Sequence, residues 1–108
     1  MSEKDNLVHL SDENFQNEIA SGVTLVDFHA TWCGPCRMIT PIVEQLAGML
    51  EGKAKIAKLD IDQSQETTAS LQITSVPTLI LFKDGKEVKR VVGVKDLDYL
   101  LNLVQSNI

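Results

Sequence analysis

The sequence predicts a single α/β domain with a central mixed sheet of about five strands flanked by about four helices. Three observations predict this fold class. Strand-like and helix-like segments alternate along residues 7–71, which is typical of a parallel sheet with crossover helices. Residues 23–30 are nearly continuously apolar, as expected of a central strand covered on both faces. Asp84-Gly85 separates two strand-like segments, which predicts a hairpin that adds an antiparallel strand at an edge.

The first half of the chain is predicted to run strand, helix, strand, helix, strand. Residues 7–10 form a short apolar strand. Residues 11–20 form a helix, because their first four residues offer an N-cap and first-turn acids. After the central strand at 23–30, residues 36–50 carry apolar side chains at helical spacing, and residues 54–61 alternate as a strand.

The second half is predicted to run helix, strand, strand, helix. Residues 65–71 form a short helix, and residues 78–83 and 86–92 flank the hairpin turn, whose two residues both need positive φ. Residues 96–105 close the chain as an amphipathic helix. Repeats, linkers and low-complexity tracts are absent from the sequence, so we expect one domain over residues 1–108.

Composition and charge narrow the class of function. The chain has 44% hydrophobic and 23% charged residues, close to the average of globular domains. Its formal net charge of -5 and its scattered basic residues argue against nucleic-acid binding, because nucleic acids are bound by clustered Lys and Arg side chains. The polar N-terminus is followed by no apolar stretch suited to a signal peptide or a membrane span, so we expect a cytoplasmic protein without membrane contact. Thiols stay reduced there, so two cysteines three apart are expected to be catalytic or metal-binding.

The segment Trp32-Cys33-Gly34-Pro35-Cys36 lies where the central strand gives way to a helix. Cysteines three apart in helical geometry share a face, so their sulfurs can meet in a disulfide. Cys33 is expected at the helix N-terminus, where free N–H groups and the macrodipole favour the nucleophilic thiolate. Pro35 fits the first turn without removing a helical hydrogen bond, and Gly34 presents no side chain to an approaching disulfide.

With its companions, this segment resembles the thioredoxin family over nearly the whole chain. The resemblance rests on Val26-Asp27-Phe28, Ala30, the Trp-Cys-Gly-Pro-Cys segment, Pro41, Lys58-Leu59-Asp60, Val76-Pro77-Thr78, Asp84-Gly85 and Gly93. A cytosolic C-x-x-C near a strand–helix–strand pattern is itself the standard example of a thioredoxin-like redox motif. The resemblance implies the thioredoxin fold and a general protein-disulfide reductase, which maintains cytosolic redox balance and supplies electrons to reductive enzymes.

The resemblance also implies a two-step exchange. Cys33 attacks a client disulfide to give a mixed disulfide, and Cys36 resolves it, leaving a reversible Cys33–Cys36 disulfide. A thioredoxin reductase then restores the dithiol with electrons from NADPH, so no bound cofactor is expected. The expected partners are this reductase and disulfide-containing clients, and the chain is expected to be a monomer. Gly34 and Pro35 are expected to tune the redox reaction.

Asp27 interrupts the apolar run of the central strand and is expected to be buried. Burial would raise the pKa of its carboxyl. From the residues alone, two interpretations stay open. Asp27 is either a catalytic proton acceptor for Cys36 in the resolving step, or one half of a buried ion pair with Lys58 that only stabilises the sheet. The resemblance favours the first interpretation, with Lys58 as a redox-tuning residue.

Four residues are predicted to bind substrate. X-Pro bonds are usually trans, but the resemblance implies that Pro77 is cis and faces the cysteine pair. It also implies that Val76 offers its backbone to an extended client. Trp32 and Gly93 are expected to extend this surface as a small apolar patch. His29 stands where the family usually has an aromatic residue; we interpret it as a packed side chain, the alternative being a group that titrates near neutrality and couples to the Cys33 pKa.

Three other functions fit the sequence less well. A zinc site normally needs about four ligands, the chain has no second cysteine pair, and His9 and His29 lack ligand spacing, so no metal site is predicted. An oxidase or isomerase of the same superfamily usually carries His between its cysteines, whereas Gly34-Pro35 is typical of reducing members. A non-catalytic docking subunit would use the same apolar patch, and a Cys36→Ser variant with full biological function would favour it.

Overall fold

The computed structural model describes residues 6–108, so the first five residues of the predicted domain lie outside the described part. The described chain forms five strands and four helices in the predicted order. In sequence they are β1 (Val8–Leu10), α1 (Phe15–Ile19), β2 (Val23–His29), α2 (Gly34–Met49), β3 (Lys55–Asp60), α3 (Gln65–Ser70), β4 (Thr78–Lys83), β5 (Lys86–Val92) and α4 (Leu97–Gln105).

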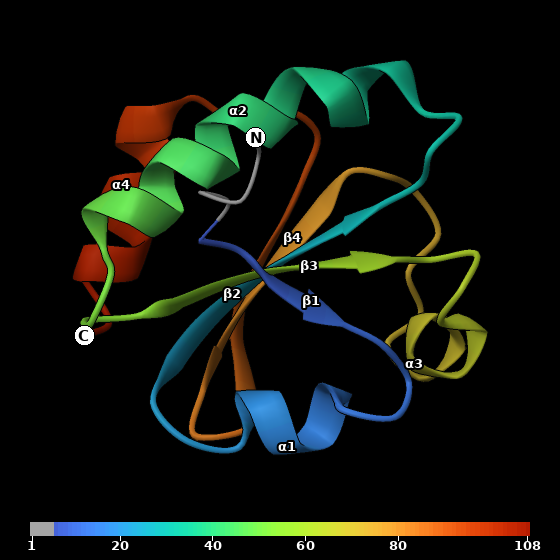
Figure 1. Ribbon diagram of the computed structural model, residues 1–108, viewed down its shortest axis with the longest axis horizontal. Coiled ribbons are helices and arrows are strands. Elements are labelled where there is room, and N and C mark those ends of the chain that lie inside the picture. Colours follow the sequence, from blue (N-terminus) through green and yellow to red (C-terminus); the bar gives the residue numbers. More distant parts are fainter. Residues whose placement is uncertain (1–5) are drawn as a thin grey trace.

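The strands form one mixed sheet in the order β1-β3-β2-β4-β5 (Figure 1). The pairs β1–β3 and β3–β2 are parallel, whereas β2–β4 and β4–β5 are antiparallel. The predicted edge position of the hairpin strand is confirmed by β5. Its turn is also confirmed, because both Asp84 (φ 51°) and Gly85 (φ 86°) have positive φ.

Helices cover both faces of the sheet, with α2 and α4 on one side and α1 and α3 on the other (Figure 1). Side chains alternate along β2, so Leu25 packs in the cluster under α2 and α4, and Phe28 packs in the opposite cluster with Phe15 of α1. Every residue of β2 except His29 is buried, which confirms the central strand that the apolar run predicts. Asp27 shares the face of Leu25 and is directed toward α2.

Two helix starts differ from the prediction by more than one residue, and a side chain explains each. The helix expected from residue 11 begins at Phe15. Ser11 N donates to Asn14 Oδ1 at 2.7 Å, so this stretch closes as a turn instead of a first helical turn. The helix expected from residue 36 begins two residues earlier, at Gly34, because the side chain of Cys33 caps it.

Strand pairing brings three loops to one end of the sheet. The parallel strands β2 and β3 end side by side there, and Ile61 N donates to His29 O at 2.9 Å just beyond them. The antiparallel pairing of Phe28 with Thr78 brings Pro77 next to the chain that leaves β2. Gly93 N donates to Pro77 O at 2.9 Å, which adds the loop after β5. The cysteine segment therefore begins where these loops converge.

Candidate active site

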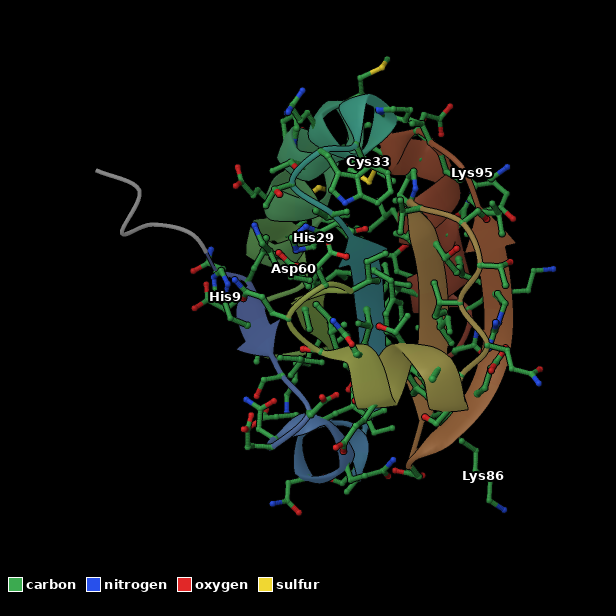
Figure 2. The ribbon with its side chains drawn as sticks, turned by 90° about the vertical axis from the view of Figure 1, so that its right-hand side faces the viewer. His9, His29, Cys33, Asp60, Lys86 and Lys95 are labelled. Carbon is green, nitrogen blue, oxygen red and sulfur yellow. A yellow bond between two sulfur atoms is a disulfide. The ribbon has the colours of Figure 1, made fainter. Side chains whose placement is uncertain are left out.

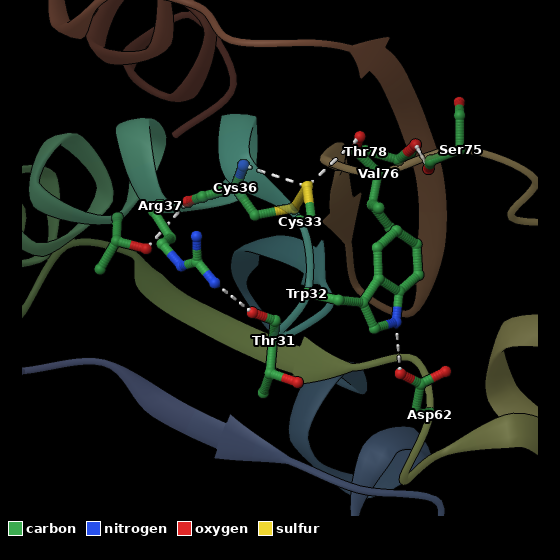
Figure 3. Close-up of a disulfide and its surroundings, with 10 residues drawn as sticks. Thr31, Trp32, Cys33, Cys36, Arg37, Asp62, Ser75, Val76 and Thr78 are labelled. Carbon is green, nitrogen blue, oxygen red and sulfur yellow. Dashed lines mark hydrogen bonds between the residues drawn. A yellow bond between two sulfur atoms is a disulfide. The ribbon is translucent and has the colours of Figure 1, made fainter.

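Cys33 and Cys36 form a disulfide at the N-terminus of α2, with 5.3 Å between their Cα atoms. Cys33 is the N-cap residue, and its Sγ accepts a hydrogen bond from Cys36 N at 3.1 Å (Figure 3). The side chains are 5% and 3% exposed, respectively. A backbone N–H directed at Sγ stabilises a thiolate on Cys33 once the disulfide is reduced. The predicted place of Cys33 at the helix N-terminus is confirmed.

Gly34 and Pro35 occupy the first turn of α2 and are exposed. Pro35 lies in the first turn, where a backbone N–H would have no acceptor within the helix. The missing N–H of proline therefore removes no helical hydrogen bond. A Cβ atom at Gly34 would meet no heavy atom within 4 Å. The chain itself therefore does not require glycine there for space, and the open volume is available to molecules that approach the disulfide.

The loop before β4 lies against the disulfide. The Val76–Pro77 peptide bond is cis, as expected, and Val76 packs on the two cysteines. Val76 O lies 3.8 Å from Cys33 Sγ (Figure 3). In the dithiol form, the Cys33 thiol has a proton that this carbonyl can accept. Gly93 has a φ of 96°, in the left-handed region that favours glycine, and its N–H holds the neighbouring Pro77 carbonyl.

Trp32 directly precedes Cys33, and its side chain is 66% exposed. Its indole Nε1 donates to Asp62 Oδ2 at 2.9 Å (Figure 3). Asp62 N in turn donates to Asp60 Oδ1 at 2.8 Å, which fixes the turn that carries the acceptor. Asp62 is not among the site residues predicted from the sequence. Its position just after β3 could have pointed to it, because parallel neighbouring strands have their carboxyl ends at the same edge of a sheet. The residues that follow β2 and β3 therefore lie close together.

Asp27 is 2% exposed, as the sequence predicts. Its Oδ1 atom has no hydrogen-bond partner. Burial raises the pKa of the carboxyl to about 7, and the positive charge of Lys58 works in the opposite direction. The raised pKa expected from burial is therefore confirmed. A carboxyl with a pKa near neutrality can both accept and release a proton at neutral pH.

Lys58 is half-buried in β3 and pairs directly with Asp27 in the parallel register. Side chains at paired positions lie on the same face of a sheet, so the two are neighbours. Within residues 6–108, however, no salt bridge joins them. Lys58 thus acts on the Asp27 carboxyl through its charge across the sheet. The Asp27–Lys58 ion pair, one of the two interpretations that the sequence allowed, is therefore not formed in this structure.

His29 ends β2 and is half-buried. It pairs with Asp60 of β3, on the same face as Asp27. Burial lowers the pKa of its imidazole, Lys58 lowers it further, Asp60 opposes both, and His9 contributes a final lowering. The imidazole is therefore neutral at neutral pH. The interpretation of His29 as a partly buried side chain is confirmed, and its coupling to Cys33 stays a prediction.

Comparison with known proteins decides the family. The family model described as Thioredoxin matches residues 6–106. The chain belongs to the thioredoxin family. The thioredoxin of Staphylococcus saprophyticus is 49% identical over 102 residues, which are 94% of this chain and 98% of that protein. The thioredoxin of Chlamydia pneumoniae is 53% identical over 98 residues, covering 91% and 95%. A solved mutant thioredoxin from Halobacterium salinarum matches with a TM-score of 0.80 at 37% identity, covering 95% of this chain and 92% of that one.

Membership of the thioredoxin family establishes the fold and the chemistry. The five-stranded mixed sheet with four helices is the thioredoxin fold, as predicted. The chain is a thiol–disulfide oxidoreductase with protein-disulfide reductase activity, and Cys33–Cys36 is its redox-active disulfide. Thioredoxins generally act on disulfide-containing clients and are served by a thioredoxin reductase.

Among residues 6–108, no three His, Cys, Asp or Glu side chains are grouped so that they would hold a metal ion. None of the helices in this range combines the length and the apolar character needed to cross a membrane.

Proposed function

We propose that this thioredoxin is a general reductant of cytoplasmic protein disulfides that receives its electrons from NADPH through a thioredoxin reductase. The observation that carries the proposal is the Gly34-Pro35 dipeptide between two disulfide-bonded cysteines, of which Cys33 caps the N-terminus of α2. This pair lacks the histidine by which oxidising members stabilise the thiolate. The chain is identical to bacterial thioredoxins at about half of the aligned positions, which supports the same reducing role. The chain acts as a monomer.

Cys33 is the attacking cysteine. Its Sγ faces Val76 and receives the Cys36 N–H, so a thiolate forms there at the helix N-terminus. The thiolate attacks one sulfur of a client disulfide; the client S–S bond breaks, the Cys33–client bond forms, and the other client sulfur leaves as a thiolate. Cys36, the more deeply buried of the two, then resolves the mixed disulfide.

Asp27 accepts the proton of Cys36 in the resolving step. It faces α2, whose first turn holds the buried Cys36, and its unpartnered Oδ1 is free to receive a proton. As the Cys36 sulfur loses its proton to the carboxylate, it attacks Cys33 Sγ. The Cys33–Cys36 bond forms and the client leaves as a thiolate. Lys58 tunes this step, because its charge favours the ionised form of Asp27.

Clients bind on the surface that surrounds the disulfide. An extended client segment lies along Val76, where the backbone of the loop before β4 faces Cys33. The cis Pro77 shapes that loop, and Gly93 leaves room beside it. The exposed indole of Trp32, next to Cys33 in the chain, supplies further apolar contact. The absent side chain at Gly34 keeps the approach to the sulfurs open.

The test uses the full chain with NADPH, thioredoxin reductase and a disulfide-linked protein such as insulin. Consumption of NADPH that depends on both cysteines supports the proposal. Cys33→Ser should abolish client reduction, whereas Cys36→Ser should accumulate a mixed disulfide between Cys33 and the client, seen by mass. The opposite assignment, with the mixed disulfide trapped on Cys36 in the Cys33→Ser variant, would overturn it. So would reductase that fails to reduce the Cys33–Cys36 pair.

A further inference from the structure

His29 lies on the same strand and the same face as the buried carboxyl of Asp27. Residues i and i+2 of a strand are about 6.4–6.8 Å apart, and their side chains point to the same side of the sheet. Asp27 is 2% exposed, whereas His29 at the end of β2 is half-buried and reaches the surface. In Figure 2, His29 lies beside Asp60, below the end of the molecule that carries Cys33. His29 is therefore the next residue on this face of β2 toward the end of the strand, and it is less buried than Asp27.

The charged and titratable groups around His29 come from three strands. Strand pairing places Asp60 next to His29, Lys58 next to Asp27, and His9 of β1 on the far side of Lys58. From α2, the buried residues above this face are Cys36, Ile39, Val43, Leu46 and Ala47, which carry no charge once the Cys33–Cys36 disulfide has closed. The net effect of burial and these neighbours keeps the imidazole neutral at neutral pH.

A neutral imidazole has the chemistry that a proton carrier needs. One ring nitrogen accepts a proton while the other donates one. Lys58 cannot serve in this way, because an ammonium group has no lone pair. Asp60 already accepts from the Asp62 and Gln63 backbone through Oδ1. His9 is separated from Asp27 by the whole of β3.

We propose that His29 carries the proton of Asp27 to and from solvent during the redox cycle. This inference rests on the proposed role of Asp27 as the proton acceptor for Cys36. After the disulfide closes, the Asp27 carboxyl gives its proton, through one bridging water, to the imidazole nitrogen of His29 that carries no hydrogen. The imidazolium then releases a proton to water, which restores both groups. Only bonds to hydrogen change, so the step needs no oxidant or reductant. His29 thus acts on the reaction only through Asp27, whose proton it relays, and does not touch the reacting sulfurs.

The experiment follows proton exchange of Asp27 directly, in the oxidised full-length protein. A rapid pH jump across the Asp27 pKa of about 7 is followed through the infrared C=O band of its protonated carboxyl, assigned by its loss in Asp27→Asn. His29→Ala and His29→Phe should slow the decay of this band by at least about tenfold, since a positioned proton-transfer group contributes roughly 10²–10⁴ to a step. The final amplitude should match the wild type.

Imidazole in solution separates a carrier from a merely structural side chain. It should restore the exchange rate of His29→Ala, which leaves room for it, and not that of His29→Phe, which fills the site. His9→Gln is the matched control and should exchange at the wild-type rate. Wild-type rates in both His29 variants, or slow exchange that imidazole does not restore in His29→Ala, would overturn the inference.

Failure of the underlying role of Asp27 has a different signature. If Asp27→Asn resolves mixed disulfides at the wild-type rate, Asp27 is not the acceptor for Cys36, whatever the infrared rates of the His29 variants show. If Asp27→Asn slows resolution but the His29 variants exchange normally, the role of Asp27 stands and that of His29 fails. In the double variant, His29→Ala should add nothing to the effect of Asp27→Asn on resolution.

Discussion

Asp27 and Lys58 occupy directly paired positions in β2 and β3, yet their side chains form no salt bridge in the described part of the chain. One carboxyl oxygen of Asp27 is left without any hydrogen-bond partner. An ionised carboxylate without close partners is costly to bury, so the neutral acid persists to an unusually high pH. Because Lys58 forms no salt bridge with it, the Asp27 carboxyl beneath α2 changes charge near neutral pH.

Burial of Asp27 predicts a stability difference that grows with pH. The folded protein holds the Asp27 proton up to about pH 7, whereas a carboxyl in the unfolded chain releases it near 3.8. Between these values the folded state binds more protons, so the contribution of Asp27 to stability falls as pH rises and levels off above the folded pKa. Asp27→Asn removes this loss and should be more stable than the wild type by a few kcal/mol at about pH 8, converging toward pH 4.

Urea unfolding of both proteins across this pH range measures the difference. Glu44→Gln, on the exposed surface of α2, is the control, and its offset from the wild type should stay nearly constant with pH. Parallel stability curves for the wild type and Asp27→Asn would show that burial does not shift the titration of this carboxyl.

The two chemical steps should respond differently to loss of the carboxyl. Asp27→Ala removes the proposed proton acceptor of Cys36 but leaves Cys33 at its helix cap. We expect mixed-disulfide resolution to slow by about 10²-fold, the lower end for a positioned base, with little change in the first attack. Stopped-flow fluorescence of the single tryptophan, Trp32, reports both steps. Equal slowing of the two steps would contradict the role.

Local signals predicted most of the fold. The strands of the hairpin have the bounds expected from the sequence, because Asp84-Gly85 fixes both ends of the turn. The first helix was predicted too long, since Asn14 satisfies the Ser11 backbone and holds the preceding stretch as a turn. Asp62 was missed because its partner is thirty positions away and only the pairing of β2 with β3 brings the two together.

The same limit applies to the site as a whole. The chemistry of the cysteine motif could be predicted because its five residues are consecutive in the sequence. The relation of Asp27 to Lys58 and of His29 to Asp60 depends on register, and a shift by one residue would put their side chains on opposite faces. Sequence alone therefore named Asp27 and Lys58 but left a salt bridge between them open.

The hydrogen bond from Trp32 to Asp62 should matter for client binding. Asp62→Leu removes the acceptor and frees the exposed indole. A lost hydrogen bond of about 1 kcal/mol would raise KM for a protein client roughly fivefold, with kcat nearly unchanged. Asp62→Asn keeps an acceptor oxygen and serves as the control. Fluorescence anisotropy of Trp32 should fall in Asp62→Leu only; unchanged anisotropy and KM in that variant would show that the bond does not hold the indole.

The redox direction can be measured as the reduction potential of the Cys33–Cys36 pair. We expect a midpoint near −270 mV, the value already known for thioredoxin. Pro35→His places an imidazole beside the Cys33 sulfur, where it stabilises the thiolate and so the dithiol form. The potential should therefore rise, by about 30 mV for each 1.4 kcal/mol of added stabilisation. Equilibration in dithiol buffers, alkylation of free thiols and mass analysis give both values. A wild-type midpoint above about −200 mV would instead make the protein an oxidant or an isomerase, because its dithiol would then be the more stable state.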